Sequence, residues 1–433
     1  MRRSSLLALF LSVLLVTAAH AKNIWRLTDI NPGSQGSYPS YLEVFGDTLY
    51  FRANDVPSGN NVELWRWNGT MAEKAAEIQP GLTGSDPAYL TAYGAGLYFA
   101  ASSDGTSPKM WRFDGTAASL APGFAVGSAF PQGMTSYGGY LVYQESHFGA
   151  DTELRRYDGA AQAPIYRVGG GNVLNPEFFC EYNGLLYFSA AGPAGGEELW
   201  RTNGSTAVQL TTILPPDGGS SPGNLAVFNG DLYFSAYDGA AGNELWRYSS
   251  ATNTASLVAD IRPGGPYVSG NPHDLCVYDG KLYFGANDGV HGDELWAYDG
   301  TNPPGMVAEI NFTPDPLNGD DWMMDSSPRN LIVYEGVLYF TATDGSDPAE
   351  GQHGREIWSW DGTQAELEFD ICPGQYGSEI TEMILYGDSV FLDADDGASG
   401  RELWRMTMPE PATLVLLAAG TFGVIFTRRR RQA

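Results

Sequence analysis

The stretch DELWAYDGT, residues 293–301, decides the fold of this chain because it occurs in eight variants along the sequence. The other seven are VELWRWNGT, PKMWRFDGT, TELRRYDGA, EELWRTNGS, NELWRYSSA, REIWSWDGT and RELWRMTMP. The position of the tryptophan falls at Trp65, Trp111, Arg155, Trp200, Trp246, Trp296, Trp358 and Trp404. Successive copies lie 44 to 62 residues apart, a spacing typical of stacked or radial repeats.

The clearest repeat predicts four short β-strands joined by tight turns. Its segments are DLCVYDG (274–280), KLYFGAND (281–288), DELWAY (293–298) and GMVAEI (305–310), which we name strands a, b, c and d. Polar and apolar residues alternate in them, and Asp-Gly or Asn-Gly supplies the positive φ that hairpin turns need. We therefore expect the Asp-Gly aspartates to form turns and the tryptophans to pack between repeats.

Strand d is missing after the last repeat and present before the first. The segment IWRLTDI (24–30) precedes any a–b–c set, whereas RELWRM (401–406) runs directly into the C-terminal tail. An open solenoid would need no such offset, and a ring protects strand edges that an open array exposes. We predict an all-β fold, an eight-bladed β-propeller of four-stranded blades over residues 22–407, with the last blade closed by the N-terminal strand.

The N-terminus reads as a targeting segment. Residues 1–21 combine Arg2 and Arg3 with an apolar run and an Ala-x-Ala site formed by Ala19 and Ala21. This pattern predicts a signal peptide for Sec export with a cleavage site after Ala21.

The C-terminal segment, 408–433, has three parts in order: a Pro-Glu-Pro motif, an uncharged run over 412–427 and a basic end. The motif and the basic end are Pro409, Glu410, Pro411, Arg428, Arg429, Arg430 and Arg431. The segment resembles the PEP-CTERM sorting signal, which implies processing by an exosortase and delivery to the surface or matrix of a Gram-negative bacterium. Its apolar run is a short transmembrane segment, so we expect transient anchoring with the arginines in the cytoplasm. A plain tail anchor is the alternative.

The charge excludes one class of partner. The formal net charge is −27, and removing both targeting segments takes away six basic residues and one acidic residue, leaving −32. Such a surface repels phosphate backbones, so we exclude nucleic-acid binding. Divalent cations would be suitable counter-ions, and a halophilic or marine setting would explain the charge equally well.

The repeat also resembles a bacterial family, the ELWxxDGT repeat proteins, over residues 24–406. Glu-Leu-Trp stands in five repeats, and Asp-Gly-Thr or Asn-Gly-Thr in four. Arg155 replaces the tryptophan in the third repeat, and Lys109-Met110 replaces Glu-Leu in the second. The family implies a propeller outside the cell and carries no assigned chemistry.

Function is expected where the repeat is broken, above all in the seventh repeat. Its loops 311–330 and 342–356 are extended, and in a propeller both lie on one face. The candidate ligand-binding residues are Asp315, Asp320, Asp321, Trp322, Asp325 and His353. Carboxylates on such loops suit Ca²⁺, and Trp322 would stack on a sugar ring. The alternative is a solvated acidic insertion without a ligand.

A second candidate is the segment LDADDGASGRE (392–402), whose Asp393, Asp395 and Asp396 resemble a calcium loop without its full spacing. No cofactor is certain, and Ca²⁺ is the one these residues would suit. His291 and His353 occupy equivalent positions in adjacent repeats, and a shared metal is the alternative to coincidence.

The start of strand a should lie nearest the centre of the ring, where a propeller enzyme places its acids and bases. Glu177, His273, Asp274 and Glu382 would form an acid–base set for glycan cleavage. No nucleophile elbow, phosphate loop or HExxH motif accompanies them, and we assign no catalytic residue.

Three cysteines are too few for a disulfide framework, so we expect three buried free thiols. We predict a binding or structural module of the envelope or matrix, with polysaccharide or surface proteins as partners. The alternative is an extracellular polysaccharide-degrading enzyme, a hydrolase or a lyase.

Overall fold

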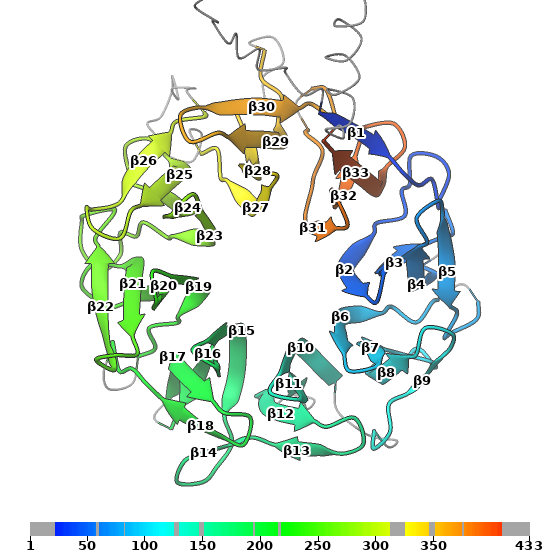
Figure 1. Cartoon of the computed structure of the whole chain (residues 1–433), viewed down its shortest axis with the longest axis horizontal. Coiled ribbons are helices and arrows are strands. Elements are labelled where there is room, and N and C mark those ends of the chain that lie inside the picture. Colours follow the sequence, from blue (N-terminus) through cyan, green and yellow to red (C-terminus); the bar gives the residue numbers. More distant parts are fainter. Residues whose placement is uncertain are drawn as a thin grey trace, which may run out of the picture.

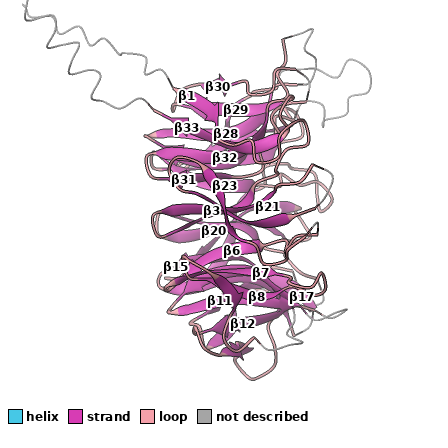
Figure 2. Cartoon of the chain, turned by 90° about the vertical axis from the view of Figure 1, so that its right-hand side faces the viewer, coloured by secondary structure: helices cyan, strands magenta, loops and turns pink. Residues whose placement is uncertain are grey.

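The computed structural model describes residues 22–57, 60–81, 83–124, 130–146, 151–193, 195–214, 218–311, 325–345, 351–374 and 376–408. Over these ranges every regular element is a β-strand (Figure 2). The strands form seven hydrogen-bonded sheets arranged radially around a common centre (Figure 1). In the described part of the chain, no helix has the length and apolar character to cross a membrane. The predicted transmembrane segment lies outside it, as do the signal peptide and residues 409–433.

Five of the sheets use one consecutive run of the chain each, and their strands follow in chain order from the centre outward (Figure 1). The first two are β2 (Ser40–Phe45), β3 (Thr48–Asn54), β4 (Val62–Trp67) and β5 (Ala72–Ala76), then β6 (Ala88–Tyr93), β7 (Gly96–Ala101), β8 (Lys109–Phe113) and β9 (Ala118–Leu120). The next two are β19 (Gly223–Phe228), β20 (Asp231–Tyr237), β21 (Asn243–Ser249) and β22 (Thr254–Ala259), then β23 (His273–Tyr278), β24 (Lys281–Asn287), β25 (Asp293–Tyr298) and β26 (Gly305–Ala308). The fifth is β27 (Arg329–Tyr334), β28 (Val337–Thr343), β29 (Arg355–Trp360) and β30 (Ala365–Phe369).

One larger sheet has nine strands and contains two consecutive repeats. Its strands are β10 (Phe130–Tyr137), β11 (Tyr140–Ser146), β12 (Glu153–Tyr157), β13 (Gln162–Pro164), β14 (Tyr166–Arg167), β15 (Leu174–Tyr182), β16 (Leu185–Gly192), β17 (Gly195–Thr202) and β18 (Thr206–Gln209). Two contacts join the repeats: the residue pair Glu153 with Leu174 connects β12 to β15, and β14 pairs in parallel with β18.

The remaining sheet joins the two ends of the described chain. It consists of β31 (Met383–Tyr386), β32 (Ser389–Asp395), β33 (Arg401–Thr407) and β1 (Asn23–Arg26), with β1 antiparallel to β33. A hydrophobic cluster that includes Leu49 and Phe51 with Phe391 and Leu403 packs this sheet against the first.

Where a repeat has the Leu-Trp pair, the two residues pack against different neighbouring sheets, because successive strand residues face opposite sides. Leu295 is buried in a cluster with Trp358 of the next sheet. Its neighbour Trp296 is buried in a cluster with Leu245 of the preceding sheet. The tryptophans therefore pack between repeats, as predicted.

The glutamate of the repeat is a buried anchor for the end of strand d. Glu294 accepts hydrogen bonds from Ile310 N at 2.8 Å, Asn311 N at 3.3 Å and Ser326 Oγ at 2.7 Å. Equivalent buried residues are Glu63, Glu198, Glu244, Glu356 and Glu402. Burial raises the pKa of Glu294 to about 8, although these hydrogen bonds act against the rise.

This anchoring also corrects the predicted extent of one strand. The segment 24–30 was expected to be a strand, whereas β1 ends at Arg26. Thr28 Oγ1 and Ile30 N donate to Glu402 Oε2 at 2.8 and 3.3 Å, so the chain leaves the sheet to satisfy the buried carboxylate.

The predicted turns have the predicted chemistry. Asn183 and Gly184 both have positive φ, 50° and 72°, as a two-residue hairpin requires. In the Asp-Gly-Thr turn, Asp361 Oδ1 accepts Thr363 N at 2.8 Å and Gln364 N at 3.0 Å.

The expectation of three buried thiols is wrong for two residues. All three cysteines are free, but only Cys372 is buried, whereas Cys180 and Cys276 are half-buried. Both half-buried residues follow the irregular start of an inner strand, which leaves their side chains partly uncovered.

Candidate functional site

The innermost strands begin with an irregular backbone that recurs around the ring. In seven repeats, the residue two places after a proline at the start of the inner strand, here called the second-position residue, has a φ near +50°, a conformation that non-glycine residues rarely adopt. These residues are Tyr41, Tyr89, Gly133, Phe178, Asn224, Asp274 and Asn330. The pairing register with the next strand shifts at the same place, for example between His273 and Cys276. Such bulges re-aim side chains, here at the inner end of each sheet.

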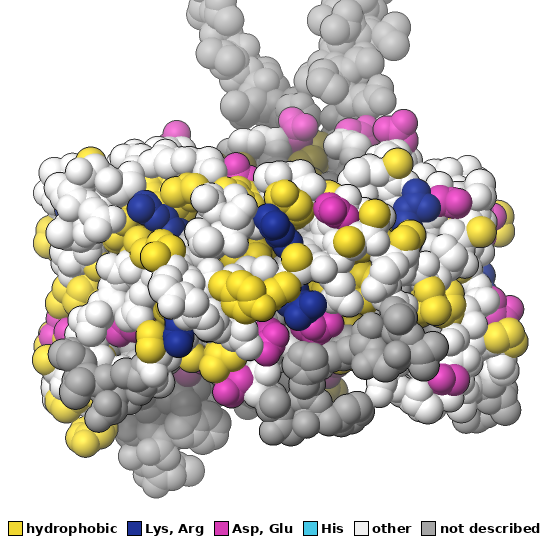
Figure 3. Space-filling model, turned by 90° about the horizontal axis from the view of Figure 1, so that it is seen from below, with side chains coloured by type: hydrophobic (Ala, Val, Ile, Leu, Met, Phe, Trp, Pro, Cys, Tyr) yellow, Lys and Arg dark blue, Asp and Glu magenta, His cyan; other side chains and the backbone are white. Residues whose placement is uncertain are grey.

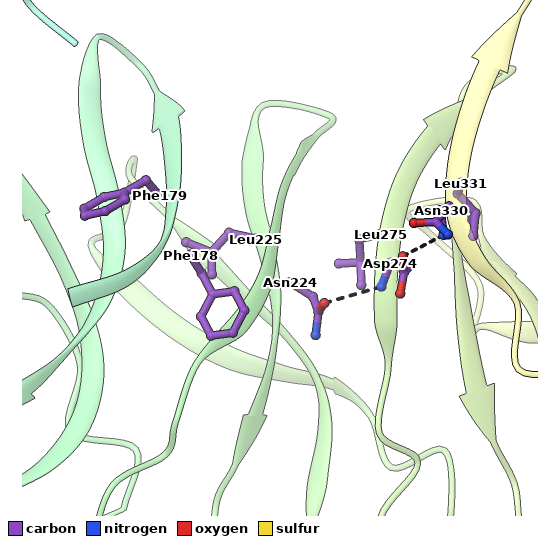
Figure 4. A pocket seen from close by; sticks show the side chains of 8 residues that line it. All are labelled: Phe178, Phe179, Asn224, Leu225, Asp274, Leu275, Asn330 and Leu331. Carbon is purple, nitrogen blue, oxygen red and sulfur yellow. Dashed lines mark hydrogen bonds between the residues drawn. The ribbon is translucent and has the colours of Figure 1, made fainter. Parts of the chain in front are cut away.

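Four consecutive inner strands line a hollow of about 330 Å³ (Figure 4). Its walls are Phe178 and Phe179 of β15, Asn224 and Leu225 of β19, Asp274 and Leu275 of β23, and Asn330 and Leu331 of β27. The second-position residues thus contribute one aromatic ring, one carboxylate and two amides. Phe178 is 50% exposed.

The polar residues of the hollow are linked from sheet to sheet (Figure 4). Asp274 N donates to Asn224 Oδ1 at 3.4 Å, and Asn330 N donates to Asp274 Oδ1 at 2.9 Å. Each side chain therefore holds the backbone of the next inner strand. The hollow is built on strands that these contacts fix relative to one another.

His273 lies behind the carboxylate of the hollow, between two aspartates. Its Nδ1 is 3.0 Å from Asp274 Oδ2, and its Nε2 is 2.9 Å from Asp293 Oδ2. Burial lowers the pKa of His273, but the hydrogen bonds with both aspartates outweigh burial and raise it to about 9. Burial likewise raises the pKa of Asp274, yet the hydrogen bonds from His273 and Asn330 N hold that pKa below its ordinary value. At neutral pH this is an imidazolium between two carboxylates.

On the other side of the ring, the second-position residues of β2 and β6, Tyr41 and Tyr89, are aromatic, whereas that of β10 is Gly133. The rings of Tyr41 and Tyr89 have centroids 5.2 Å apart, and Tyr89 meets Phe130 edge-on at 6.4 Å. The guanidinium of Arg52 lies 4.9 Å from the Tyr41 ring centroid. The inner ends of the first sheets are therefore aromatic, whereas those of β19, β23 and β27 are polar.

Of the six candidate residues in the seventh repeat, the structure describes two, Asp325 and His353. Asp315, Asp320, Asp321 and Trp322 lie outside the described residues. Asp325 Oδ1 accepts a hydrogen bond from Asp293 N at 2.6 Å, which places Asp325 beside the His273 cluster. His353 Nδ1 is 2.8 Å from Asp344 Oδ2 of its own loop. His291 has the same arrangement with Asp288, at 2.7 Å.

The three aspartates of the calcium-loop candidate have separate roles. Asp393 is fully buried, accepts Thr381 N at 3.0 Å and Glu382 N at 2.9 Å, and lies 3.5 Å from Arg401. Asp395 and Asp396 each accept backbone N–H groups of their own turn. The structure does not bring the three together, and its described residues hold no group of three side chains able to bind a metal.

The predicted acid–base set is also dispersed. Asp274 lines the hollow and His273 contacts it, whereas Glu382 accepts a hydrogen bond from Leu42 N at 3.1 Å. Sequence reasoning missed Phe178, Asn224 and Asn330, although all stood at the variable position already singled out. The signal was a change from aromatic to polar residues along that position.

Two family models match parts of the chain. Residues 409–431 match the PEP-CTERM protein-sorting motif, and residues 187–359 match the outer membrane protein assembly factor BamB. The first match indicates export and sorting to the bacterial cell surface, with processing by an exosortase. The second indicates BamB-like propeller repeats over β16 to β29. No curated protein matches the chain.

Several solved structures are similar to this chain. A prolyl endopeptidase matches with a TM-score of 0.51 and 10% identity, over 84% of this chain and 55% of that chain. A puromycin hydrolase matches with 0.46 and 13%, over 85% and 60%. The β-propeller domain of the Trilobed protease from Pyrococcus furiosus matches with 0.42 and 12%, over 78% and 100%. This chain thus spans little more than half of the two enzymes, and at such identities the likeness concerns the fold alone. The chain is all-β with a propeller-like fold.

Proposed function

We propose that this protein is a closed, eight-bladed propeller of the ELWxxDGT type that binds a saccharide in its central hollow at the cell surface. The pairing of β1 with β33 and the apolar cluster between the last and first sheets support closure. The division of the nine-stranded sheet into two repeats supports eight blades. Export by the Sec route in a Gram-negative bacterium, with transient anchoring through the tail, completes the proposal.

The observation that carries the binding role is the exposed ring of Phe178 beside three hydrogen-bonding side chains. Sugars present an apolar ring face and a rim of hydroxyl groups. Aromatic faces complement the first, and amides and carboxylates complement the second. Phe178 offers the apolar face, and Asp274 and Asn330 offer hydrogen-bonding groups in the same hollow. The amide of Asn224 already bonds to Ser235 Oγ, Pro272 O and Asp274 N, so it shapes the hollow.

The same hollow favours binding over hydrolysis as the proposed activity. Glycoside hydrolysis uses two carboxyl groups that flank one bond, roughly 5 to 9.5 Å apart. Among the described residues that line the hollow, Asp274 alone carries a carboxylate.

Binding of the exported protein to an oligosaccharide panel, measured by calorimetry, tests the proposal. Phe178→Ala should weaken binding by about 3- to 10-fold, because it removes the stacking face. Tyr267→Ala is the matched control, since Tyr267 is 96% exposed and outside the lining of the hollow. Equal affinities of the two variants, or no saccharide binding by the parent protein, would refute the proposal.

A further inference from the structure

We propose that the hollow is selective for an uncharged saccharide, and that His273 sets this selectivity by neutralising the carboxylate of Asp274. This inference rests on the proposed function and names its ligand class. It is carried by the contacts of Asp274, by the space made for the His273 ring, and by the charges around them.

Both oxygens of the Asp274 carboxylate already have partners. Oδ1 accepts the hydrogen bond from Asn330 N at 2.9 Å, and Oδ2 faces His273 Nδ1 at 3.0 Å, with Arg329 Nη1 at 3.7 Å. A carboxylate held in this way still has lone pairs for a hydroxyl group. It offers a ligand a hydrogen-bond acceptor without a free negative charge.

A glycine on the neighbouring strand leaves the space that the His273 ring occupies. Gly285 pairs with His273 in the sheet, and a Cβ at residue 285 would overlap the imidazole ring. The equivalent residues in the neighbouring sheets are Ser235 and Thr341, which pair with Gly223 and Arg329. The glycine therefore accompanies the histidine, as expected if the ring must occupy this position.

The charges around the ring cancel. His273, Arg329 and Arg355 supply the positive charges, and Asp274 and Asp293 oppose them directly. Asp325 adds a third carboxylate next to Asp293, at 2.6 Å from its backbone nitrogen. This neutral cluster lies in a chain whose formal charge is −27.

Charge then decides between ligands of similar shape. A uronic acid would approach a strongly acidic protein, and the cations nearest the hollow among the described residues, His273 and Arg329, already face Asp274. A protonated amino sugar would compete with His273 for Asp274. On the outer wall seen in Figure 3, acidic and basic side chains are interspersed with apolar ones. An uncharged pyranose is the class that the hollow accommodates without an unpaired charge.

Calorimetry with β-1,4-linked tetrasaccharides of glucose, glucuronic acid and glucosamine tests the inference on the full exported protein. At low salt, the glucose oligomer should bind at least about tenfold more tightly than either charged oligomer. Binding of all three with equal affinity would overturn the inference and leave the proposed saccharide binding intact. Binding of none would overturn both.

Two substitutions test the role of His273. His273→Gln removes the positive charge and should weaken binding of the glucose oligomer while strengthening that of glucosamine, each by about tenfold. Gly285→Ser, which introduces the residue found at position 235, should displace the ring and act in the same direction. His291→Gln is the control, because His291 pairs with Asp288 on an outer loop and should change neither affinity.

The affinity of His273→Gln for the glucosamine oligomer distinguishes a positioning role of His273 from a role in the stability of the fold. A residue that only supports the fold would weaken all three ligands together. A parallel loss for glucose and glucosamine in His273→Gln, with an unchanged melting temperature, would overturn the assigned role of His273.

Discussion

Arg155 Nε lies 2.8 Å from Glu145 Oε2, and this ion pair stands where the other repeats have tryptophan and alanine. In two of those repeats the indole donates to the alanine carbonyl: Trp111 to Ala101 and Trp404 to Ala394, both at 3.0 Å. The third repeat has changed both positions, and Glu145 is buried with its charge opposed by Arg155. The repeat that lacks the tryptophan therefore carries an ion pair at the two changed positions.

Breaking this pair should be costly, whereas replacing both residues should not. Glu145→Ala leaves the largely buried Arg155 with only the more distant carboxylate of Glu153, at 3.7 Å, and should lower the free energy of unfolding by about 3 kcal/mol. The double variant Glu145→Ala/Arg155→Trp restores the common pattern and should be neutral or stabilising. Urea denaturation of both variants measures the difference, and equal stabilities would contradict the argument.

Stability should decrease as the pH rises from about 5 to 8. The buried anchors Glu244, Glu294 and Glu356 have pKa values raised by burial from 4.5 to about 7, about 8 and about 7. Between these values the folded state holds protons that the unfolded chain releases, so stability is full below the unfolded pKa and is lost as pH rises through the folded one. The expected loss is on the order of 1 kcal/mol per group, measured by urea midpoints at a series of pH values.

Glu294→Gln is the control for this dependence. The amide keeps an acceptor for Ile310 N but cannot titrate, so the decline between pH 5 and 8 should become shallower. An unchanged slope would show that other groups cause the decline.

Below pH 4 a separate loss of stability is expected, because hydrogen bonds from Thr116 hold the pKa of the turn residue Asp114 at about 2.

A disulfide can test the pairing of the two chain ends. Ile24 lies opposite Met406 in the ladder of β1 and β33, and such pairs are about 5 Å apart at Cα. In a background without native cysteines, Ile24→Cys/Met406→Cys should oxidise readily to an intramolecular disulfide. Ile24→Cys/Leu385→Cys should not, because β31 is the opposite edge of the same sheet. The migration of the oxidised chains in gels reports the result.

Asp393 should behave as a structural residue. Its carboxylate organises Thr381 and Glu382 and lies against Arg401, so Asp393→Ala should lower the free energy of unfolding by about 2 to 3 kcal/mol. The melting temperature of the parent protein should be the same with Ca²⁺ and with a chelator. A calcium-dependent rise that Asp393→Ala abolishes would instead establish the metal role.

Much of the fold was predictable because the repeats of this chain can be compared with one another. The alternation in KLYFGAND and DELWAY predicted β24 and β25, and the Asp-Gly signals predicted their turns. The predictions for the seventh repeat remain untested where they fall on Asp315, Asp320, Asp321 and Trp322. The contact of Asp325 with Asp293 could not be predicted from the sequence, because it depends on how two sheets meet.

The sequence by itself determined the sheets, the turns and the packing of Leu and Trp, since these follow from local alternation and from contacts that every repeat shares. Only the tertiary structure decided the hollow. Its second-position residues lie about 50 residues apart along the chain and meet because the sheets converge at their inner ends. They are Phe178, Asn224, Asp274 and Asn330. His273 and Gly285 likewise form one unit only in the register of β23 with β24. Local patterns specify the strands. The chemistry of this site comes from residues that are far apart in the sequence and lie together only because of how the sheets are arranged.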